Sequence, residues 1–313
     1  MMPEWMSQDF ELFDTHAHLG DDGCPDETEY YRRAEKAGVP WILLCGSDFE
    51  TSRRAAEFAS HFDRVFFAAG LHPLDVVKHP CEAEAFKAFA DAPRFAAVGE
   101  IGLDYYYERD TRDTQIEVFR SFLELALRLD RPAIVHTRDV DDSTLAYDDA
   151  YPLLSAFAGA GGRFVLHSFA GSVADLERFD ALGAYFGCGG MVTFKKADNI
   201  RALALRYPED RILLETDSPY LAPVPFRGKE NHPGYLPWTA HSLAALRGWS
   251  MKKTVTLTTS NAKRFFRIPP EDMTSRLAIN RGSSPATSIL PSQYIAASGS
   301  LPRMDFMKAE IVS

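Results

Sequence analysis

Eight short apolar runs, separated by stretches with a helical pattern, restrict most strongly how this chain of 313 residues can fold. Continuous apolar runs such as WILLC and RILLE suit parallel strands that are covered on both faces. Strands that alternate with helices in this number predict an α/β fold, a (β/α)8 TIM barrel, rather than an open doubly wound sheet. The expected strands are Glu11–Thr15, Trp41–Cys45, Val65–Gly70, Phe95–Gly99, Ala133–His136, Arg163–His167, Ala184–Cys188 and Arg211–Glu215.

Two of the intervening helices can be bounded from the sequence. Apolar residues three and four positions apart predict one helix over Thr111–Leu129. Its first turn is expected to be capped by Thr111 or Asp110. A second helix is predicted over Asp26–Ala37, because the following Gly38 is a common stop signal at helix C-termini.

The alternating pattern ends near Phe266, and the composition changes after it. Two prolines follow, and then a stretch rich in Ser, Ala, Arg and Pro without sustained periodicity. We therefore expect a single barrel domain over residues 1–268 and a C-terminal extension over residues 269–313 that is loosely attached or disordered. The alternative is a short helix near Met304–Val312 that docks on the barrel or on a partner.

Cysteine use and the N-terminus predict a cytoplasmic protein. The four cysteines form no CxxC pair, which favours reduced and partly buried thiols. The N-terminus is acidic and lacks the basic and apolar regions of a secretory signal. No apolar run approaches the roughly 20 residues that span a bilayer, so no membrane association is expected. The oligomeric state is left open.

The net charge of −10 argues against sequence-independent binding along the length of a polyanion. It does not exclude a nucleic-acid substrate, because cations and a few arginines can make one cleft locally positive. DNA or RNA would then be held at an end.

Six side chains that can bind metals lie at the ends of five of the apolar runs. They are His16 and His18 in DTHAHLG, Glu100 in GEIGLDYYY, His136 in IVHTRD, His167 in VLHSF and Asp217 in LLETDSPYL. Residues two apart on a strand point the same way, so His16 and His18 can converge on one ion. Since the carboxyl ends of barrel strands meet at one face, the six residues predict a metal centre there.

The ligand types suit two divalent cations, with Mg²⁺, Mn²⁺ or Zn²⁺ as candidates. A carboxylate such as Glu100 can bridge two cations roughly 3.5–4 Å apart. Such a pair lowers the pKa of water toward neutrality and supplies hydroxide at pH 7. Asp217 can both ligate a metal and accept the proton of the water, which gives it and Glu100 the expected catalytic roles.

The motifs between DTHAHL and NAKRFF, roughly residues 12–266, resemble the TatD-type metal-dependent deoxyribonucleases of the amidohydrolase-like barrel superfamily. AAGLHP, GEIGLDYYY, LHSFAGS and ETDSPYLAPVPFRGKENHP are the longest of them. The resemblance implies that His16, His18, Glu100 and Asp217 hold one metal and that Glu100, His136 and His167 hold the second. It also implies hydrolysis of phosphodiester bonds, removing nucleotides from the 3′ end of DNA.

The sequence departs from the family pattern in two places. Gly20 stands where an acidic residue is usual, and Ser168 stands where many relatives have Cys. Neither position is an expected ligand.

Further residues near these motifs are candidates for contact with substrate. They are His72 in GLHP, Arg138 two residues past His136, and Arg227, Lys229 and Asn231 in the loop after the last strand. Arginine can grip two phosphate oxygens, although Arg138 can equally form an ion pair with Asp139 or another surface acid. Asp104 is expected to orient a ligand histidine. Tyr105–Tyr107 can stack on a nucleobase, or at least one of them is core.

The same barrel fold is also compatible with other functions. A metal hydrolase acting on an ester or C–N bond, such as an aminoacyl-tRNA ester or a cyclic amide, is the main alternative. Many amide hydrolases of this kind carry a carbamylated Lys where this chain has Glu100, which favours the phosphodiesterase. No serine has a base and an orienting group at suggestive positions, and no GxxxxGK[ST] or GxGxxG motif indicates a nucleotide cofactor. A catalytically silent barrel would not need all six ligands.

Overall fold

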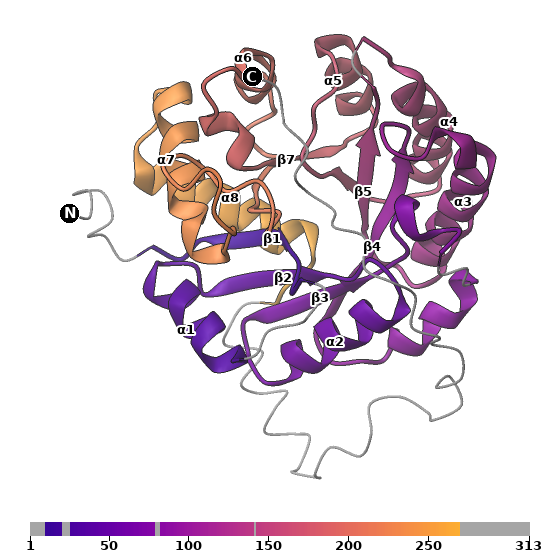
Figure 1. Ribbon diagram of the computed structural model, residues 1–313, viewed down its shortest axis with the longest axis horizontal. Coiled ribbons are helices and arrows are strands. Elements are labelled where there is room, and N and C mark those ends of the chain that lie inside the picture. Colours follow the sequence, from indigo (N-terminus) through magenta and orange to yellow (C-terminus); the bar gives the residue numbers. More distant parts are fainter. Residues whose placement is uncertain (1–9, 21–25, 79–81, 141, 270–313) are drawn as a thin grey trace. The chain divides into compact units, whose positions relative to one another are not determined.

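A parallel sheet of eight strands lies at the centre of the protein (Figure 1), as seen in a computed structural model that describes residues 10–20, 26–78, 82–140 and 142–269. The strands follow one another in chain order, and each neighbouring pair from β1 to β8 is parallel. They are β1 (Phe13–Ala17), β2 (Trp41–Cys45), β3 (Val65–Ala69), β4 (Phe95–Asp104), β5 (Ala133–Arg138), β6 (Phe164–Leu166), β7 (Tyr185–Cys188) and β8 (Ile212–Leu214).

Helices fill the connections and lie outside the sheet (Figure 1), which confirms the predicted (β/α)8 barrel. The α-helices are α1 (Glu27–Lys36), α2 (Phe49–Ser60), α3 (Arg112–Arg128), α4 (Leu145–Gly159), α5 (Val173–Asp180), α6 (Asp198–Ala204), α7 (Leu236–Arg247) and α8 (Met251–Phe265). The 3-10 helices are η2 (Pro73–Asp75), η3 (Ala83–Phe89), η4 (Arg109–Thr111), η5 (Gly190–Thr193) and η6 (Pro233–Tyr235). In its described part, the connection from β3 to β4 contains η2 and η3 in place of an α-helix.

The loop after β8 joins the end of β1 and so brings the first and last strands together. Ala17 and Ser218 form a parallel bridge. The backbone N–H of Asp217 donates to the carbonyl of His16 (2.9 Å), and that of His18 donates to the carbonyl of Ser218 (2.6 Å). These bonds place two of the expected ligand segments side by side at the carboxyl ends of the strands.

An apolar cluster fills the barrel near the amino-terminal ends of the strands. It joins the first residues of β1 and β2, Phe13 and Trp41, to Phe265 and Phe266 at the end of α8. The rings of Phe13 and Phe266 lie 5.8 Å apart between centroids. Burying a phenylalanine side chain contributes about 1.5–3 kcal/mol to the stability of the fold. The amino-terminal end of the barrel therefore stabilises the fold, and the expected ligand residues lie at the opposite end.

Strand boundaries differ from the sequence-based ones where metal-ligand residues occur. β1 was expected over Glu11–Thr15 and instead runs over Phe13–Ala17, so His16 lies within the strand. β4 continues to Asp104, which places Glu100 within the strand rather than just past it, and β5 continues two residues beyond His136 to Arg138. β6 ends at Leu166, so His167, expected as a strand residue, directly follows the strand. The parallel pairing of β4 with β5 from Ile101 to Asp104 provides the backbone partners that extend both strands.

The two bounded helices are close to their predicted ranges, but the N-cap expected of Thr111 or Asp110 is not formed. Asp26 caps α1 by accepting from the N–H of Glu29 (2.9 Å). Thr111 occupies the N-cap position of α3 but makes no capping bond, because its hydroxyl donates to the carbonyl of Glu108 (2.8 Å). Among the described residues, no helix is both long and apolar enough to cross a membrane.

The described residues all belong to one compact unit, Met1–Arg281. The expected tail from residue 270 onward, including the alternative helix at Met304–Val312, lies outside the described residues. Cys45 and Cys188 are free thiols and buried, as expected.

Candidate metal centre

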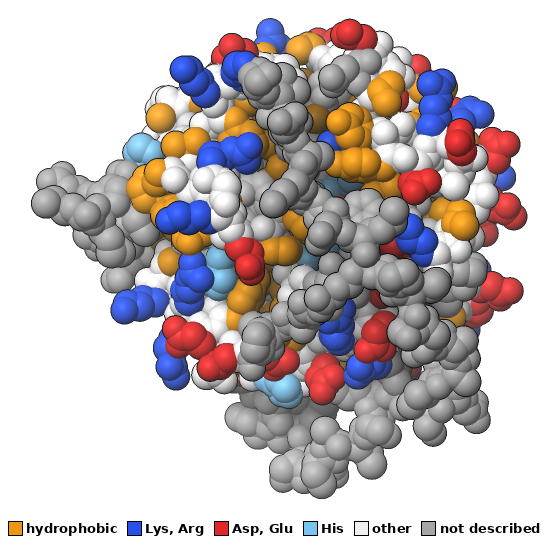
Figure 2. All heavy atoms as spheres, viewed as in Figure 1, with side chains coloured by type: hydrophobic (Ala, Val, Ile, Leu, Met, Phe, Trp, Pro, Cys, Tyr) orange, Lys and Arg blue, Asp and Glu red, His pale blue; other side chains and the backbone are white. Residues whose placement is uncertain are grey.

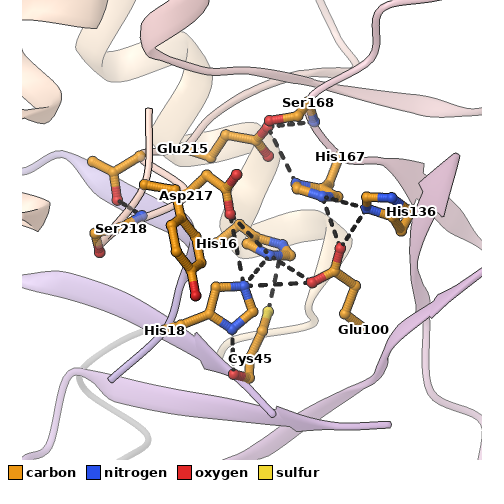
Figure 3. Close-up of polar contacts among 12 residues, drawn as sticks. His16, His18, Cys45, Glu100, His136, His167, Ser168, Glu215, Asp217 and Ser218 are labelled. Carbon is orange, nitrogen blue, oxygen red and sulfur yellow. Dashed lines mark hydrogen bonds and ion pairs between the residues drawn. The ribbon is translucent and has the colours of Figure 1, made fainter. Parts of the chain in front are cut away.

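The six expected ligand side chains point toward one space at the carboxyl ends of the strands (Figure 3). Five segments supply them: His16 from β1 with His18 directly after it, Glu100 from β4, His136 from β5, His167 directly after β6, and Asp217 from the loop after β8. His16, Glu100 and His167 are buried, and the other three are partly exposed. The carboxyl-terminal face of the barrel therefore carries the cluster that the sequence predicted.

His16, His18 and Asp217 supply a first group of donor atoms, and Glu100 Oε2 lies beside its two imidazoles. The imidazole Nε2 atoms of His16 and His18 lie 3.0 Å apart. They lie 3.2 and 3.4 Å from Glu100 Oε2, and 3.8 and 3.6 Å from Asp217 Oδ1. Four donors held about 2.1 Å from a zinc ion would be separated by about 3.4 Å. The five separations given above bracket that value.

A second group forms around the other oxygen of Glu100. Glu100 Oε1 lies 2.9 Å from His136 Nδ1 and 2.8 Å from His167 Nε2, and those two nitrogens are 3.4 Å apart. One carboxylate therefore presents one oxygen to each group of donors. This is the arrangement that a bridging carboxylate requires.

In two of the four expected ligand histidines, the second ring nitrogen faces an oxygen acceptor that helps to orient the ring. His18 Nδ1 lies 2.9 Å from the carbonyl of Cys45, and His136 Nε2 lies 3.1 Å from Asp104 Oδ2. Asp104 is itself held by the backbone N–H groups of Tyr106 and Tyr107, each at 3.0 Å. Outer partners of this kind accompany metal-bound imidazoles, and the expected orienting contact of Asp104 is present.

Glu215 is a buried acid beside the centre that sequence reasoning missed. One of its oxygens lies 3.7 Å from His167 Nδ1 and accepts from the N–H of Ser168 (2.5 Å). Its side chain is 1% exposed. The sequence carried a signal for this residue, because Glu215 ends the apolar run RILLE. A charged residue in such a run is almost never buried without a partner.

Asp14 is a second missed residue, and it holds the loop that carries Asp217. Its carboxylate is fully buried and accepts from the N–H (2.9 Å) and the hydroxyl (2.5 Å) of Thr216. Asp217 has a φ of 57°, a left-handed conformation that costs energy outside glycine. The bonds to Thr216 help to maintain that conformation. Burial raises the pKa of Asp14 to about 7.

The charges at the centre favour cations. Burial opposes ionisation of Glu100, but the neighbouring imidazoles, His167 first, lower the pKa of Glu100 well below its usual range. Burial likewise opposes the charge on His136, yet Asp104 and Glu100 raise the pKa of His136 to about 9. Metal ions and protons compete for the same ring nitrogens. The buried carboxylates that hold protons on these rings are thus suited to hold divalent cations in their place.

His72 reaches the centre as a hydrogen-bond donor. Burial lowers the pKa of His72 to about 3, so its ring is neutral at pH 7. Its Nδ1 accepts from the N–H of Leu74 (3.2 Å), which leaves the proton on Nε2. That nitrogen is 3.7 Å from Glu100 Oε1. Nε2 groups spatially with donor atoms of Glu100 and His136, but a protonated nitrogen donates and does not ligate.

The arginines expected to touch substrate lie against aromatic rings. The guanidinium carbon of Arg138 is 4.2 Å from the ring centroid of Tyr106 and 4.8 Å from that of Tyr107. The alternative pairing of Arg138 with Asp139 is not formed, because Asp139 accepts from the N–H groups of Val140 and Ala146. Arg227 is exposed, with its guanidinium carbon 3.8 Å from the ring centroid of Phe194.

Asn231 corrects an expectation. It is 3% exposed, and its side-chain amide donates to the carbonyls of Thr216 (2.8 Å) and Tyr220 (2.6 Å). Its side-chain oxygen accepts from the N–H of His232 (2.8 Å). The side chain therefore holds the loop around Asp217 and is not directed at substrate.

Comparison with known proteins places this geometry among metal-dependent hydrolases. Residues 13–267 match the family model described as TatD related DNase. The chain is 36% identical to an uncharacterized metal-dependent hydrolase, YabD, of Bacillus subtilis, over 82% of this chain and 99% of that protein. It is 35% identical to the 3′-5′ ssDNA/RNA exonuclease TatD of Klebsiella pneumoniae, over 78% and 92% of the two chains.

A solved structure agrees with these sequence matches. The crystal structure of YJJV, a TatD homologue from Escherichia coli, superposes with a TM-score of 0.75 at 30% identity, covering 82% of this chain and 98% of that one.

Proposed function

Since this chain belongs to the TatD related DNase family of metal-dependent hydrolases, we propose that it hydrolyses phosphodiester bonds in DNA, removing nucleotides from a 3′ end. The observation that carries the proposal is the position of Glu100, whose two oxygens face two separate groups of donor atoms. A relative over 78% of the chain is named as a 3′-5′ ssDNA/RNA exonuclease, which supports the substrate class and the polarity.

Two divalent cations fit the two donor groups. His16, His18, Glu100 and Asp217 would hold one, and Glu100, His136 and His167 would hold the other. Imidazole-rich sites accept several ions, so Mg²⁺, Mn²⁺ and Zn²⁺ are the candidates. When bound, the ions supply Lewis-acid stabilisation of negative charge and water activation at neutral pH.

The protein's own side chains handle the proton and the phosphate. The Asp217 side chain is 15% exposed, so it can meet solvent and accept a proton from the attacking water. His72 directs a donor at the same space and can bond a phosphate oxygen. Arg227, on the loop after β8, can grip another phosphate oxygen.

Surface charge favours substrates held at an end. On the face seen in Figure 2, basic and acidic side chains are interspersed, and the chain carries a net charge of −10. Binding along a duplex needs a succession of phosphate contacts. A metal centre with a few neighbouring cationic groups instead suits a strand terminus.

The test is a substrate panel of end-labelled single-stranded DNA, RNA, aminoacyl-tRNA and cyclic amides, each assayed with Mg²⁺, Mn²⁺ and Zn²⁺. We expect DNA to shorten from its 3′ end and EDTA to stop the reaction. Intact DNA of every length, together with cleavage of an aminoacyl ester or an amide by the same metal-loaded preparation, would contradict the proposal and support the alternative hydrolase.

The barrel alone is proposed to carry this activity, with residues 269–313 as an extension of it. The family match ends at residue 267, and Phe266 completes the apolar cluster. We expect a chain ending at Pro269 to keep the circular dichroism spectrum and the turnover number of the full protein. A lower melting temperature or a lost spectrum would show that the barrel depends on the removed segment. A cytoplasmic location agrees with the free Cys45 and Cys188 thiols.

A further inference from the structure

Two large aromatic side chains beside the metal centre are exposed, although the chain has a core that could take them. Tyr106 is 41% exposed and Tyr107 is 39% exposed. The neighbouring Tyr105 is 1% exposed, and its hydroxyl donates to Asp149 (2.8 Å). In the sequence YYY, one ring therefore serves the core and two are available to a ligand.

The exposed rings are fixed relative to the centre. Their backbone N–H groups both donate to Asp104 Oδ1, and Asp104 Oδ2 contacts His136. The two rings meet edge to face at 4.7 Å between centroids. One buried carboxylate thus connects an expected metal ligand, His136, to the segment that carries both rings.

Arg138 adds a cation to the same surface. It lies two residues beyond His136 on β5, with its guanidinium over both rings. Within the part of the chain that the structure describes, this guanidinium forms no ion pair. A guanidinium stacked on aromatic rings keeps its N–H groups available for phosphate oxygens.

We propose that Tyr106, Tyr107 and Arg138 form a subsite that stacks an unpaired nucleobase and grips its phosphate next to the scissile bond. This inference rests on the proposed phosphodiesterase function. Aromatic rings combined with a neighbouring arginine are the chemistry that holds single-stranded nucleic acid without reading its sequence. A base still paired in a duplex cannot offer its face to the rings, so the subsite selects single-stranded ends.

The experiment compares three substrates: a single-stranded oligonucleotide with a normal 3′-terminal base, the same oligonucleotide with an abasic 3′-terminal residue, and bis(p-nitrophenyl) phosphate. We expect the wild-type protein to cleave the normal end with a kcat/KM at least about tenfold above that of the abasic end. The double variant Tyr106→Leu/Tyr107→Leu should lose this ratio, mainly through KM. The variant Tyr106→Phe/Tyr107→Phe should restore it, because the ring and not the hydroxyl stacks.

A matched control is Tyr151→Leu, since Tyr151 on α4 also lies beneath an arginine, Arg178 at 5.3 Å, but away from the centre. In Tyr151→Leu, the ratio of kcat/KM on the normal end to kcat/KM on the abasic end should equal that of the wild type. Equal rates on normal and abasic ends in the wild type, or an unchanged ratio in the leucine double variant, would overturn the subsite while leaving the phosphodiesterase intact. Failure to cleave any of the three diesters would overturn both proposals.

Discussion

Replacing Glu100 by Gln is expected to lower the turnover number at least about 10³-fold and to reduce the bound metal from two equivalents to one or none. The reason lies in the contacts of this single carboxylate. Its Oε2 faces His16 and His18, and its Oε1 faces His136 and His167. Glutamine keeps the shape of the side chain but removes the negative charge and one of the two acceptor oxygens, so neither donor group keeps its full set.

Metal content by inductively coupled plasma mass spectrometry and steady-state rates together check this prediction. Glu117→Gln is the matched control, because it makes the same chemical change at an exposed residue of α3, away from the centre. It should retain two equivalents of metal and the wild-type rate. If Glu100→Gln binds two equivalents of metal firmly and its turnover number is within tenfold of the wild type, Glu100 does not bridge two cations.

Asp217→Asn is the second change with a large expected effect, a fall in the turnover number of about 10²- to 10⁴-fold. Asp217 Oδ1 lies 3.8 and 3.6 Å from the Nε2 atoms of His16 and His18, and it is the more accessible carboxylate of that donor group. Asparagine would remove both the charge of a proposed metal ligand and the group proposed to accept a proton from water.

Rates for this variant should be measured at saturating metal, so that weakened binding and lost proton transfer are separated. A variant that regains full metal content but not turnover identifies Asp217 as the proton acceptor. Asp91→Asn, at an exposed position, serves as the control and should be unaffected. Near-normal turnover in metal-saturated Asp217→Asn would move the proton-accepting role to another group.

The sequence predicted the fold and the gathering of ligands because both depend on local patterns. Trp41–Cys45 was predicted to the residue, since an apolar run buried on both faces has clear limits. The six donors came together because strand ends in a barrel share one face. Predicting these features requires no knowledge of the contacts between residues that are distant in sequence.

What the sequence could not predict depends on contacts between distant segments. The register of β1 shifts between Asp14 and Ala17 where it pairs with β2, and the strand starts two residues after its expected start. Asp14 acts through Thr216, and Asn231 turned inward to hold the loop around Asp217. No periodicity in the chain reports such partners, so their roles were missed or misassigned.

The joining of β1 to the loop after β8 has a consequence for how the protein is made. Asp14 and Thr216 are 202 residues apart in sequence, and their hydrogen bonds join the segment that carries His16 to the segment that carries Asp217. During synthesis, the ribosome must therefore release most of the chain before the catalytic group is complete. A polypeptide that ends before Asp217 carries only five of the six expected ligands, so the proposed first metal site is complete only in a chain that extends past β8.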